Sequence, residues 1–234
     1  MLSIVPTPIG NLADLTLRAI ETLRTADVIA AEDTRHSGML LQHHGIHRPL
    51  VSFHEHNEAM RTAELLERLR GGAHVAVITD AGTPSISDPG ARLVRACAEA
   101  GLEYTVLPGP CAAITALVGS GFDASAFFFG GFLPVKSGQR HNELAAAVAR
   151  DGTSIFYESP HRLAKSLAVL AEIAPERLAC VARELTKKFE EYRRGFPADL
   201  VAHYEAHPPK GEICLLVEGA DAAARREKLA QRSL

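Results

Sequence analysis

The chain has 234 residues, enough for one large domain or for two smaller domains with separate hydrophobic cores. Hydrophobic residues make up 47% and charged residues 23%, which is typical of a globular protein and excludes a disordered or fibrous one. The formal net charge of −3 excludes nucleic-acid binding through a strong overall basic field, although a local basic patch can still act in this way.

The chain starts without the segments of a signal peptide, and no apolar run reaches the length of a transmembrane helix. We therefore expect a cytoplasmic protein. The cysteines are far apart in the sequence and show neither a CxxC motif nor the Cys/His spacing of metal ligands. Reduced and buried thiols are expected at all four positions, Cys97, Cys111, Cys180 and Cys214.

Short apolar runs alternate with helical patterns through the first half of the chain. Strands are predicted at residues 2–5, 27–31, 50–53, 74–78 and 103–107. Helices are predicted at residues 15–24, 37–44, 59–69, 91–100 and 111–118. This alternation predicts a parallel sheet covered by helices.

The second half begins with an aromatic run and continues the α/β pattern. Strands are predicted at residues 127–133, 153–157, 178–183 and 213–217, and helices at 143–150, 162–173 and 198–205. Residues 136–140 are interpreted as a charged turn, and residues 220–234 as a charged surface helix or frayed tail. The change of pattern near residues 117–124 predicts two α/β domains, an N-terminal one at 1–118 and a C-terminal one at 119–234.

The most informative segment is residues 79–90, TDAGTPSISDPG, which directly follows an apolar strand. In an open α/β sheet, ligands bind at the carboxyl ends of the strands. Glycines let backbone N–H groups approach a ligand, while Ser85, Ser87 and Asp88 add hydrogen-bonding groups. We interpret the segment as a cradle for a small molecule, the alternative being a long surface loop with a helix cap at Ser87 or Asp88.

Three other polar sets each allow two interpretations. Glu32 and Asp33 either bind a ribose or an amine, or cap the following helix. The sequence HEH at residues 54–56 suggests a metal site, but no third ligand has a clear spacing, so solvated or nucleic-acid-contacting histidines are expected instead. The basic residues at 183–188 form surface ion pairs or bind phosphate.

The sequence lacks the signature motifs of several large enzyme classes. There is no GxSxG nucleophile motif, no P-loop and no zincin motif. The first strand is not followed by GxGxxG, so a dinucleotide-binding enzyme is not supported.

Eight motifs occur in an order that is similar to a known family. They are VPTPIGNL (5–12), AEDTR (31–35), SFHEHNE (52–58), residues 79–90, FGGFLP (129–134), YESPHR (157–162), RELTK (183–187) and KGE (210–212). Together they resemble the ribosomal RNA small-subunit methyltransferase I family of the tetrapyrrole methylase superfamily. The resemblance covers the chain from residue 2 to about residue 219.

The resemblance implies an S-adenosylmethionine-dependent enzyme that 2′-O-methylates a decoding-site cytidine of small-subunit (16S) ribosomal RNA. It implies two α/β domains with the cofactor in the cleft between them, a homodimer, and ribosomal RNA as the partner. The acidic net charge is reconciled with RNA binding by a dimer that joins two basic rims or by recognition of an assembled particle. By analogy, the cofactor contacts fall on Ile9, Ala81, Gly82, Thr83, Ile86, Cys111, Ala112, Glu158, Glu184, Gly211 and Glu212.

The transferred methyl group needs an aligned 2′-oxygen that loses its proton, so a nearby base would help. The candidate catalytic bases are Glu184, Asp33 and His54, with Glu55 and His161 as further choices. The candidates for contact with RNA phosphates are Arg35, Arg162, Arg183, Lys187 and Lys188. No metal is expected.

Two features separate this sequence from the pattern of the wider superfamily. Most of its members have a GxGxG turn after the first strand, where this chain has PTPIG at residues 6–10, which favours the RNA branch. Members of that branch often carry a further small C-terminal domain, whereas this sequence stops at Leu234, soon after the last predicted strand. The alternatives are a tetrapyrrole C-methyltransferase and a non-catalytic RNA-binding assembly protein.

Overall fold

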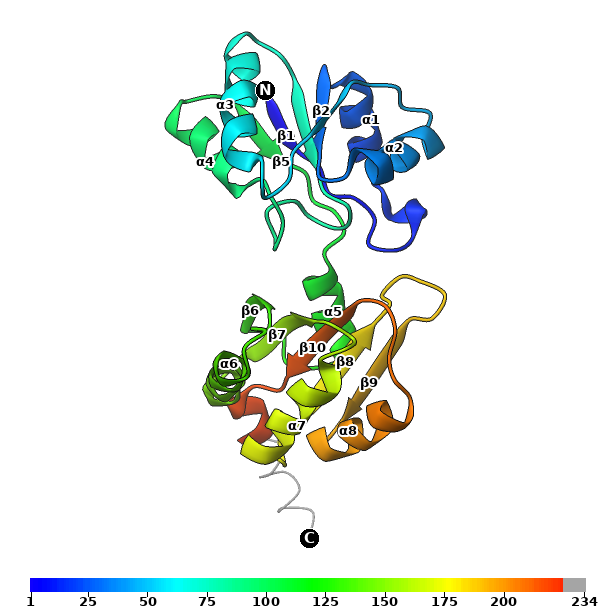
Figure 1. The fold of residues 1–234 in the computed structure, drawn as a ribbon, viewed down its shortest axis with the longest axis vertical. Coiled ribbons are helices and arrows are strands. Elements are labelled where there is room, and N and C mark those ends of the chain that lie inside the picture. The colour runs from blue at the N-terminus through cyan, green and yellow to red at the C-terminus, as the bar shows by residue number, and fades with distance from the viewer. Residues whose placement is uncertain (225–234) are drawn as a thin grey trace. The chain divides into compact units, whose positions relative to one another are not determined.

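The computed structural model describes residues 1–224, which belong to two compact units. The first unit is Met1–Cys111 and the second begins at Ala112 (Figure 1). Each unit contains its own five-stranded sheet with helices against it, so the predicted α/β class with two sheets is confirmed. The predicted boundary between residues 118 and 119 lies inside α5 (Ala112–Ser120), which belongs to the second unit.

The first sheet is entirely parallel, as predicted, with the strand order β3-β2-β4-β1-β5. Its central strands are buried, which explains their continuous apolar sequences such as Val-Ile-Ala-Ala and Val-Ala-Val-Ile. The strands are β1 (Leu2–Ile4), β2 (Val28–Ala31), β3 (Leu50–Ser52), β4 (Val75–Ile78) and β5 (Tyr104–Val106).

Helices cover both faces of the first sheet (Figure 1). One hydrophobic cluster lies beneath α1 (Leu17–Thr25) and α2 (Thr34–His43), and a second lies beneath α3 (Glu58–Arg70) and α4 (Ala91–Glu99). A short 3-10 helix, η1 (Leu12–Asp14), precedes α1. Because helices cover both faces of the sheet, a ligand is expected at the loops that follow the carboxyl ends of the strands.

The second sheet is mixed, with the strand order β6-β7-β10-β8-β9. Only β6 and β7 pair in parallel, and the remaining neighbours are antiparallel. The bounds of its strands are β6 (Phe127–Phe132), β7 (Thr153–Glu158), β8 (Ala179–Arg183), β9 (Glu191–Gly195) and β10 (Ile213–Val217).

One hydrophobic cluster joins the second sheet to three helices, α6 (Ser137–Ala149), α7 (Leu163–Ile173) and α8 (Pro197–Ala206). One prediction in this unit is wrong, and one strand was missed. Residues 137–140 form the first turn of α6 rather than a charged turn, with Arg140 buried against the carbonyls of Pro134 and Val135. Strand β9 was not predicted, because its sequence EYRRG is polar and its register comes from pairing with β8.

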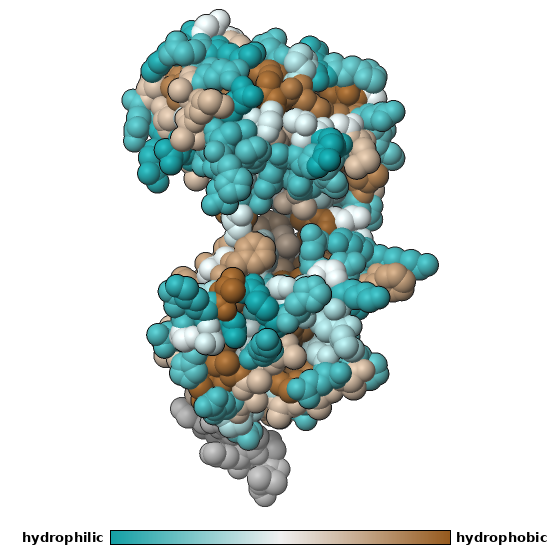
Figure 2. Space-filling model, viewed as in Figure 1, coloured by the Kyte–Doolittle hydropathy of each residue, from teal (hydrophilic) through white to brown (hydrophobic). Residues whose placement is uncertain are grey.

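The surface and the cysteines follow ordinary rules of burial. Most of the visible surface of each unit is hydrophilic (Figure 2). No disulfide joins the four cysteines; Cys97, Cys180 and Cys214 are buried as expected, whereas Cys111 is only half-buried, because it follows a loop in which Pro108 and Gly109 are exposed. Among the described residues, no helix is both long and apolar enough to cross a membrane. Most of the tail predicted at residues 220–234 lies outside the described residues.

Candidate functional site

Three loops of the first unit meet at the carboxyl ends of adjacent strands β4, β1 and β5. Thr7 and Gly82 exchange two backbone hydrogen bonds, of 2.9 and 3.0 Å, in an isolated antiparallel bridge. The Thr83 hydroxyl donates to the Pro110 carbonyl at 2.9 Å, and the Thr7 hydroxyl donates to the Thr79 carbonyl at 3.0 Å. The strand order thus brings together loops that are far apart in the sequence, from Thr7 to Pro110.

Gly82 is the narrowest point of this loop cluster. Its φ of +84° is in the region that favours glycine, and an added Cβ would lie 3.4 Å from Cγ2 of Ile9. In the described part of the chain, the backbone N–H groups of Ala81 and Thr83 have no protein acceptor. A side-chain-free residue between two available donors suits a polar cofactor that lies close to the backbone.

The rest of the loop has a strained backbone that its surroundings hold in place. Ser85 and Ser87 have φ values of 74° and 65°, although neither is glycine. Gly90, at φ 133°, ends the loop, and its N–H donates to the carboxylate of Glu58 at 2.9 Å. An added Cβ at Gly90 would lie 2.6 Å from the Ser85 hydroxyl, so only glycine fits there.

Three carboxylates lie near one another along this edge. Asp80 accepts the N–H of Asp33 at 3.2 Å, and the N–H of Asp80 points to Glu32 at 3.5 Å. Burial, followed by the charges of Glu32 and Asp80, raises the pKa of Asp88 to about 7. The Asp88 carboxyl therefore titrates near neutral pH, which is unusual for a carboxyl group.

Asp33 acts as a helix cap, one of the two roles that the sequence left open. Its carboxylate accepts the N–H groups of Arg35 at 2.8 Å and His36 at 3.4 Å at the start of α2. The side-chain hydrogen bond from Arg35 and these backbone donors lower the pKa of Asp33 to about 2. A carboxylate of this pKa is a weak proton acceptor.

His54 lies in a loop organised by Asn57. Asn57 accepts the backbone N–H of His54 at 2.9 Å, and its side-chain amide lies 3.2 Å from His54 Nε2. His54 Nδ1 is buried and has no partner among the described groups, which leaves it able to serve a ligand. The ring of His56 is 5.9 Å away, and within the described residues no group of three or more candidate ligands forms a metal site.

In the second unit, Glu184, Gly211 and Glu212 lie together where β8 and β10 pair. The Glu184 N–H donates to the Glu212 carbonyl at 3.0 Å, and the Glu212 N–H donates to the Glu184 carboxylate at 3.1 Å. Lys187 Nζ bridges the carboxylates of Glu184 at 2.8 Å and Glu212 at 2.6 Å. Gly211, at φ +85°, leaves no room for a Cβ against Glu184.

The charge of Glu184 is held by these neighbours. Burial raises the pKa of the Glu184 carboxyl, but hydrogen bonds from Lys187 and the Glu212 N–H outweigh burial and leave that pKa below its ordinary value. Glu184 itself has a positive φ of 52°. Glu184 therefore presents an ionised carboxylate, held by Lys187 and Glu212, on a strained turn.

The other candidates of the second unit are engaged in internal contacts. Glu158 is buried, with its carboxylate on Arg162 at 2.7 Å, on the Ser166 hydroxyl at 2.5 Å and on the Ser159 N–H at 2.7 Å. Arg183 pairs with Glu191 at 3.1 Å. Lys188 lies at the β8–β9 turn, with its Nζ 5.6 Å from the ring of Phe189.

The predicted residues therefore fall into two structured groups, one in each unit. Ile9, Gly82 and Thr83 meet in the first unit, with Ala81 and Ile86 exposed on the same loop and Cys111 after Pro110. Glu184, Gly211 and Glu212 meet in the second, whereas Ala112 begins α5 and is not part of that cluster. Sequence reasoning missed Glu58 as an anchor; its only signal was its place in SFHEHNE.

Comparisons with known proteins show which sequences and folds this chain is similar to. Residues 1–201 match the family model described as Tetrapyrrole (Corrin/Porphyrin) Methylases. A ribosomal RNA small subunit methyltransferase I from Synechocystis sp. is 49% identical over 94% of this chain and 79% of that protein. A protein of the same name from Escherichia coli O157:H7 is 50% identical over 93% of this chain and 77% of its own length.

Solved structures support the fold. The uroporphyrin-III-C-methyltransferase from Thermus thermophilus superposes with a TM-score of 0.65 and 23% identity, covering 97% of both chains. At that identity the likeness concerns the fold alone.

Proposed function

Since the chain belongs to the ribosomal RNA small subunit methyltransferase I family of the tetrapyrrole methylases, we propose that it 2′-O-methylates a decoding-site cytidine of small-subunit (16S) ribosomal RNA. Methyltransferases of this family use S-adenosylmethionine. The observation that carries the proposal is the identity of 49% to 50% with relatives of that name over more than nine-tenths of this chain.

The reaction is a displacement in which the carbon–sulfur bond breaks as a bond forms between the methyl carbon and the 2′-oxygen. S-Adenosylmethionine supplies the electrophilic methyl group. The 2′-hydroxyl proton passes to a base, and the sulfide product is neutral. The protein's task is then to align the 2′-oxygen, to exclude water and to accept one proton.

The cofactor residues proposed for the first unit are Ile9, Ala81, Gly82, Thr83, Ile86 and Cys111. The bare backbone at Gly82 and the N–H groups of Ala81 and Thr83 support this assignment. The residues proposed for the second unit are Ala112, Glu158, Glu184, Gly211 and Glu212, where the ordered turn at Glu184 and Gly211 gives the support. Glu158 would act through its backbone, since its carboxylate is already saturated by three donors.

Among the proposed bases, the geometry favours His54 over Asp33. Asp33 is occupied as a helix cap and its pKa is about 2, whereas His54 has a buried ring nitrogen without a partner among the described groups. Glu184 is ionised but holds Lys187. Asp88, with a pKa of about 7, is a further group whose protonation state suits proton transfer.

The proposed assembly follows from charge. A chain with a net charge of −3 gains little from its overall field toward RNA, so we propose that it acts in the cytoplasm as a homodimer on an assembled small ribosomal particle. Of the phosphate contacts expected from the sequence, we retain Lys188, which is exposed, because Arg35, Arg162, Arg183 and Lys187 are each paired with a carboxylate.

The test is methyl transfer from labelled S-adenosylmethionine to small ribosomal subunits that lack the modification, followed by mapping of the label in the RNA. Label on one decoding-site ribose is the expected result. Label on a base, or transfer only to a tetrapyrrole, would contradict the proposal. Binding of RNA without binding of S-adenosylmethionine would indicate a non-catalytic assembly protein.

A further inference from the structure

Most cations that the sequence nominates for RNA are neutralised inside the protein. Arg162 pairs with the buried Glu158, Arg183 pairs with Glu191, and Lys187 lies between two carboxylates. A cation already paired with a carboxylate gains little from a phosphate, because it must first give up its partner. An RNA substrate, which the proposed function requires, needs cations that are free.

Besides Lys188 of the second unit, which is exposed and has no ion pair among residues 1–224, such cations lie on the first unit, around the end of α2. Residues 34–54 contain two arginines and five histidines and no Asp or Glu, in a chain whose net charge is −3. Arg48 is exposed and, within residues 1–224, has no hydrogen-bond or ion-pair partner. Arg24 is also exposed, and its guanidinium donates to the His44 carbonyl at 3.2 Å without a described carboxylate in range.

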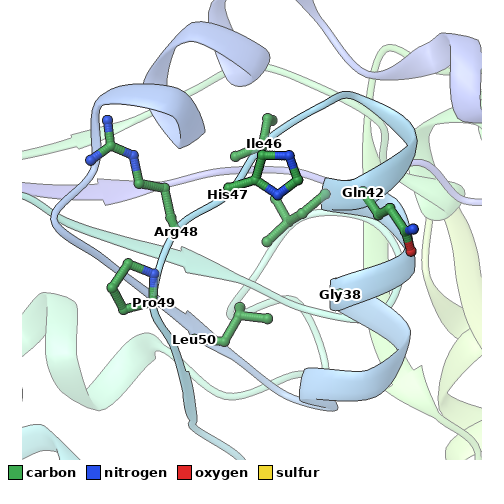
Figure 3. A pocket seen from close by; sticks show the side chains of 8 residues that line it. Gly38, Gln42, Ile46, His47, Arg48, Pro49 and Leu50 are labelled. Carbon is green, nitrogen blue, oxygen red and sulfur yellow. The ribbon is translucent and has the colours of Figure 1, made fainter.

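Arg48 borders a depression of about 560 Å³ between α2 and β3 (Figure 3). Leu41 and Ile46 are buried and give it an apolar floor. Exposed polar groups rise at its edge, with Gln42 on α2 and Arg48 on the segment that leads into β3, at opposite sides of the depression (Figure 3). An apolar floor beside a free guanidinium matches the two halves of a nucleotide, a flat base and a phosphate.

The local electrostatics favour an anion. The last carbonyls of α2 carry partial negative charge, which would repel a phosphate. Arg24 donates to the carbonyl of His44 at the end of α2 and so offsets part of this negative charge. The positive charge of Arg48 therefore remains available to a phosphate. No described acidic residue lines the depression.

We propose that this depression, with Arg48 at its edge, binds the RNA substrate, with a backbone phosphate on Arg48 and an unpaired base over Leu41 and Ile46. The proposal rests on the proposed function and adds a contact surface on the first unit. The partner is single-stranded or looped RNA, because bases inside a duplex cannot reach a floor of this kind.

The test compares full-length Arg48→Glu with Arg95→Glu. Arg95 is an exposed arginine of α4, on the opposite face of the same sheet, so both variants change the charge equally. Arg48→Glu is expected to raise the KM for undermethylated small subunits about tenfold, with kcat and S-adenosylmethionine affinity unchanged. The salt dependence of binding to a decoding-region RNA hairpin should flatten by about one phosphate contact. Arg95→Glu should behave as wild type.

Other outcomes would contradict the proposal that this depression binds RNA. An unchanged KM and salt slope in Arg48→Glu, or equal losses in both variants, would do so. A shift in oligomeric state with RNA binding intact would assign the surface to a protein contact instead. Arg48→Ala, which should show a smaller loss, replaces Arg48→Glu if the latter unfolds.

RNA binding is measured apart from methylation, so the two proposals fail separately. If the wild type binds RNA but transfers no methyl group, the proposed function fails while the surface is still tested by binding.

Discussion

At the scale of single residues, backbone strain marks the candidate site. The four non-glycine residues with positive φ in the described chain are Ser85, Ser87, Glu184 and Thr186, and all lie in the loops proposed for the cofactor or next to them. Each such conformation costs on the order of 1–3 kcal/mol and persists only where its surroundings enforce it. Strain confined to these two loops agrees with a site built in advance of its ligand.

Gly82 gives the most direct test of the cofactor loop. Gly82→Val is expected to weaken S-adenosylmethionine binding at least tenfold, because the side chain would fill the backbone approach beside Ile9. The measurement is calorimetric titration of the folded variant. Gly72→Val is the control, since Gly72 has a similar φ of +87° and open space at its Cβ position. Unchanged affinity in Gly82→Val would move the cofactor elsewhere.

Asp88 predicts a dependence of stability on pH. Its pKa is about 7 in the folded protein against an ordinary 3.8, so the folded state binds this proton more tightly than the unfolded state. The resulting stabilisation is complete below about pH 4 and is lost as the pH rises through 7. Asn does not titrate, so the stability of Asp88→Asn lacks this dependence on pH. The Tm of the variant minus that of the wild type should therefore rise between pH 4 and pH 7. Exposed Asp151→Asn is the control, and a flat difference for Asp88→Asn would refute the assignment.

At the scale of elements, one helix depends on another for its cap. No side-chain cap of its own begins α4, and the Gly90 N–H is satisfied instead by Glu58, the first residue of α3. Glu58 thereby fixes the end of the strained loop that precedes α4. Residues 52–58 and 79–90, which the sequence shows as separate motifs, act as one structural unit.

Glu58→Ala is expected to lower the free energy of unfolding by about 1 kcal/mol, the usual value of a helix cap. It should also weaken S-adenosylmethionine binding severalfold by releasing Gly90. Glu58→Gln, whose amide oxygen still accepts the Gly90 N–H, should restore most of the binding. Glu55→Ala, an exposed neighbour, is the control for lost charge. Loss of stability without loss of affinity would reduce Glu58 to a purely structural role.

At the scale of the molecule, each unit has the parts of an independent domain. The first unit has a five-stranded parallel sheet with a hydrophobic cluster on each face. The second has its own mixed sheet and core. Neither sheet takes a strand from the other unit.

A fragment of residues 1–111 is therefore expected to fold by itself, with one cooperative thermal transition followed by circular dichroism. A fragment of residues 1–100 is the control, because it lacks β5 and leaves β1 as an open edge. That shorter fragment should aggregate or remain unfolded. A longer fragment that shows no cooperative transition would mean that the first unit needs the second.

The sequence by itself determined the parallel α/β sheet of the first unit, since continuous apolar strands and amphipathic helices are local patterns that repeat in order. Its contiguous motifs, through their resemblance to a known family, also predicted Gly82, Thr83 and Glu184 as cofactor contacts. It could not locate β9, whose polar residues become a strand only through β8, nor the first turn of α6. Only the tertiary structure decided that Asp33 caps a helix, that Glu58 anchors Gly90, and that Arg162 and Lys187 are paired while Arg48 has no partner within residues 1–224. Partners distant in sequence determine a charged group's availability, and folding alone brings those partners together.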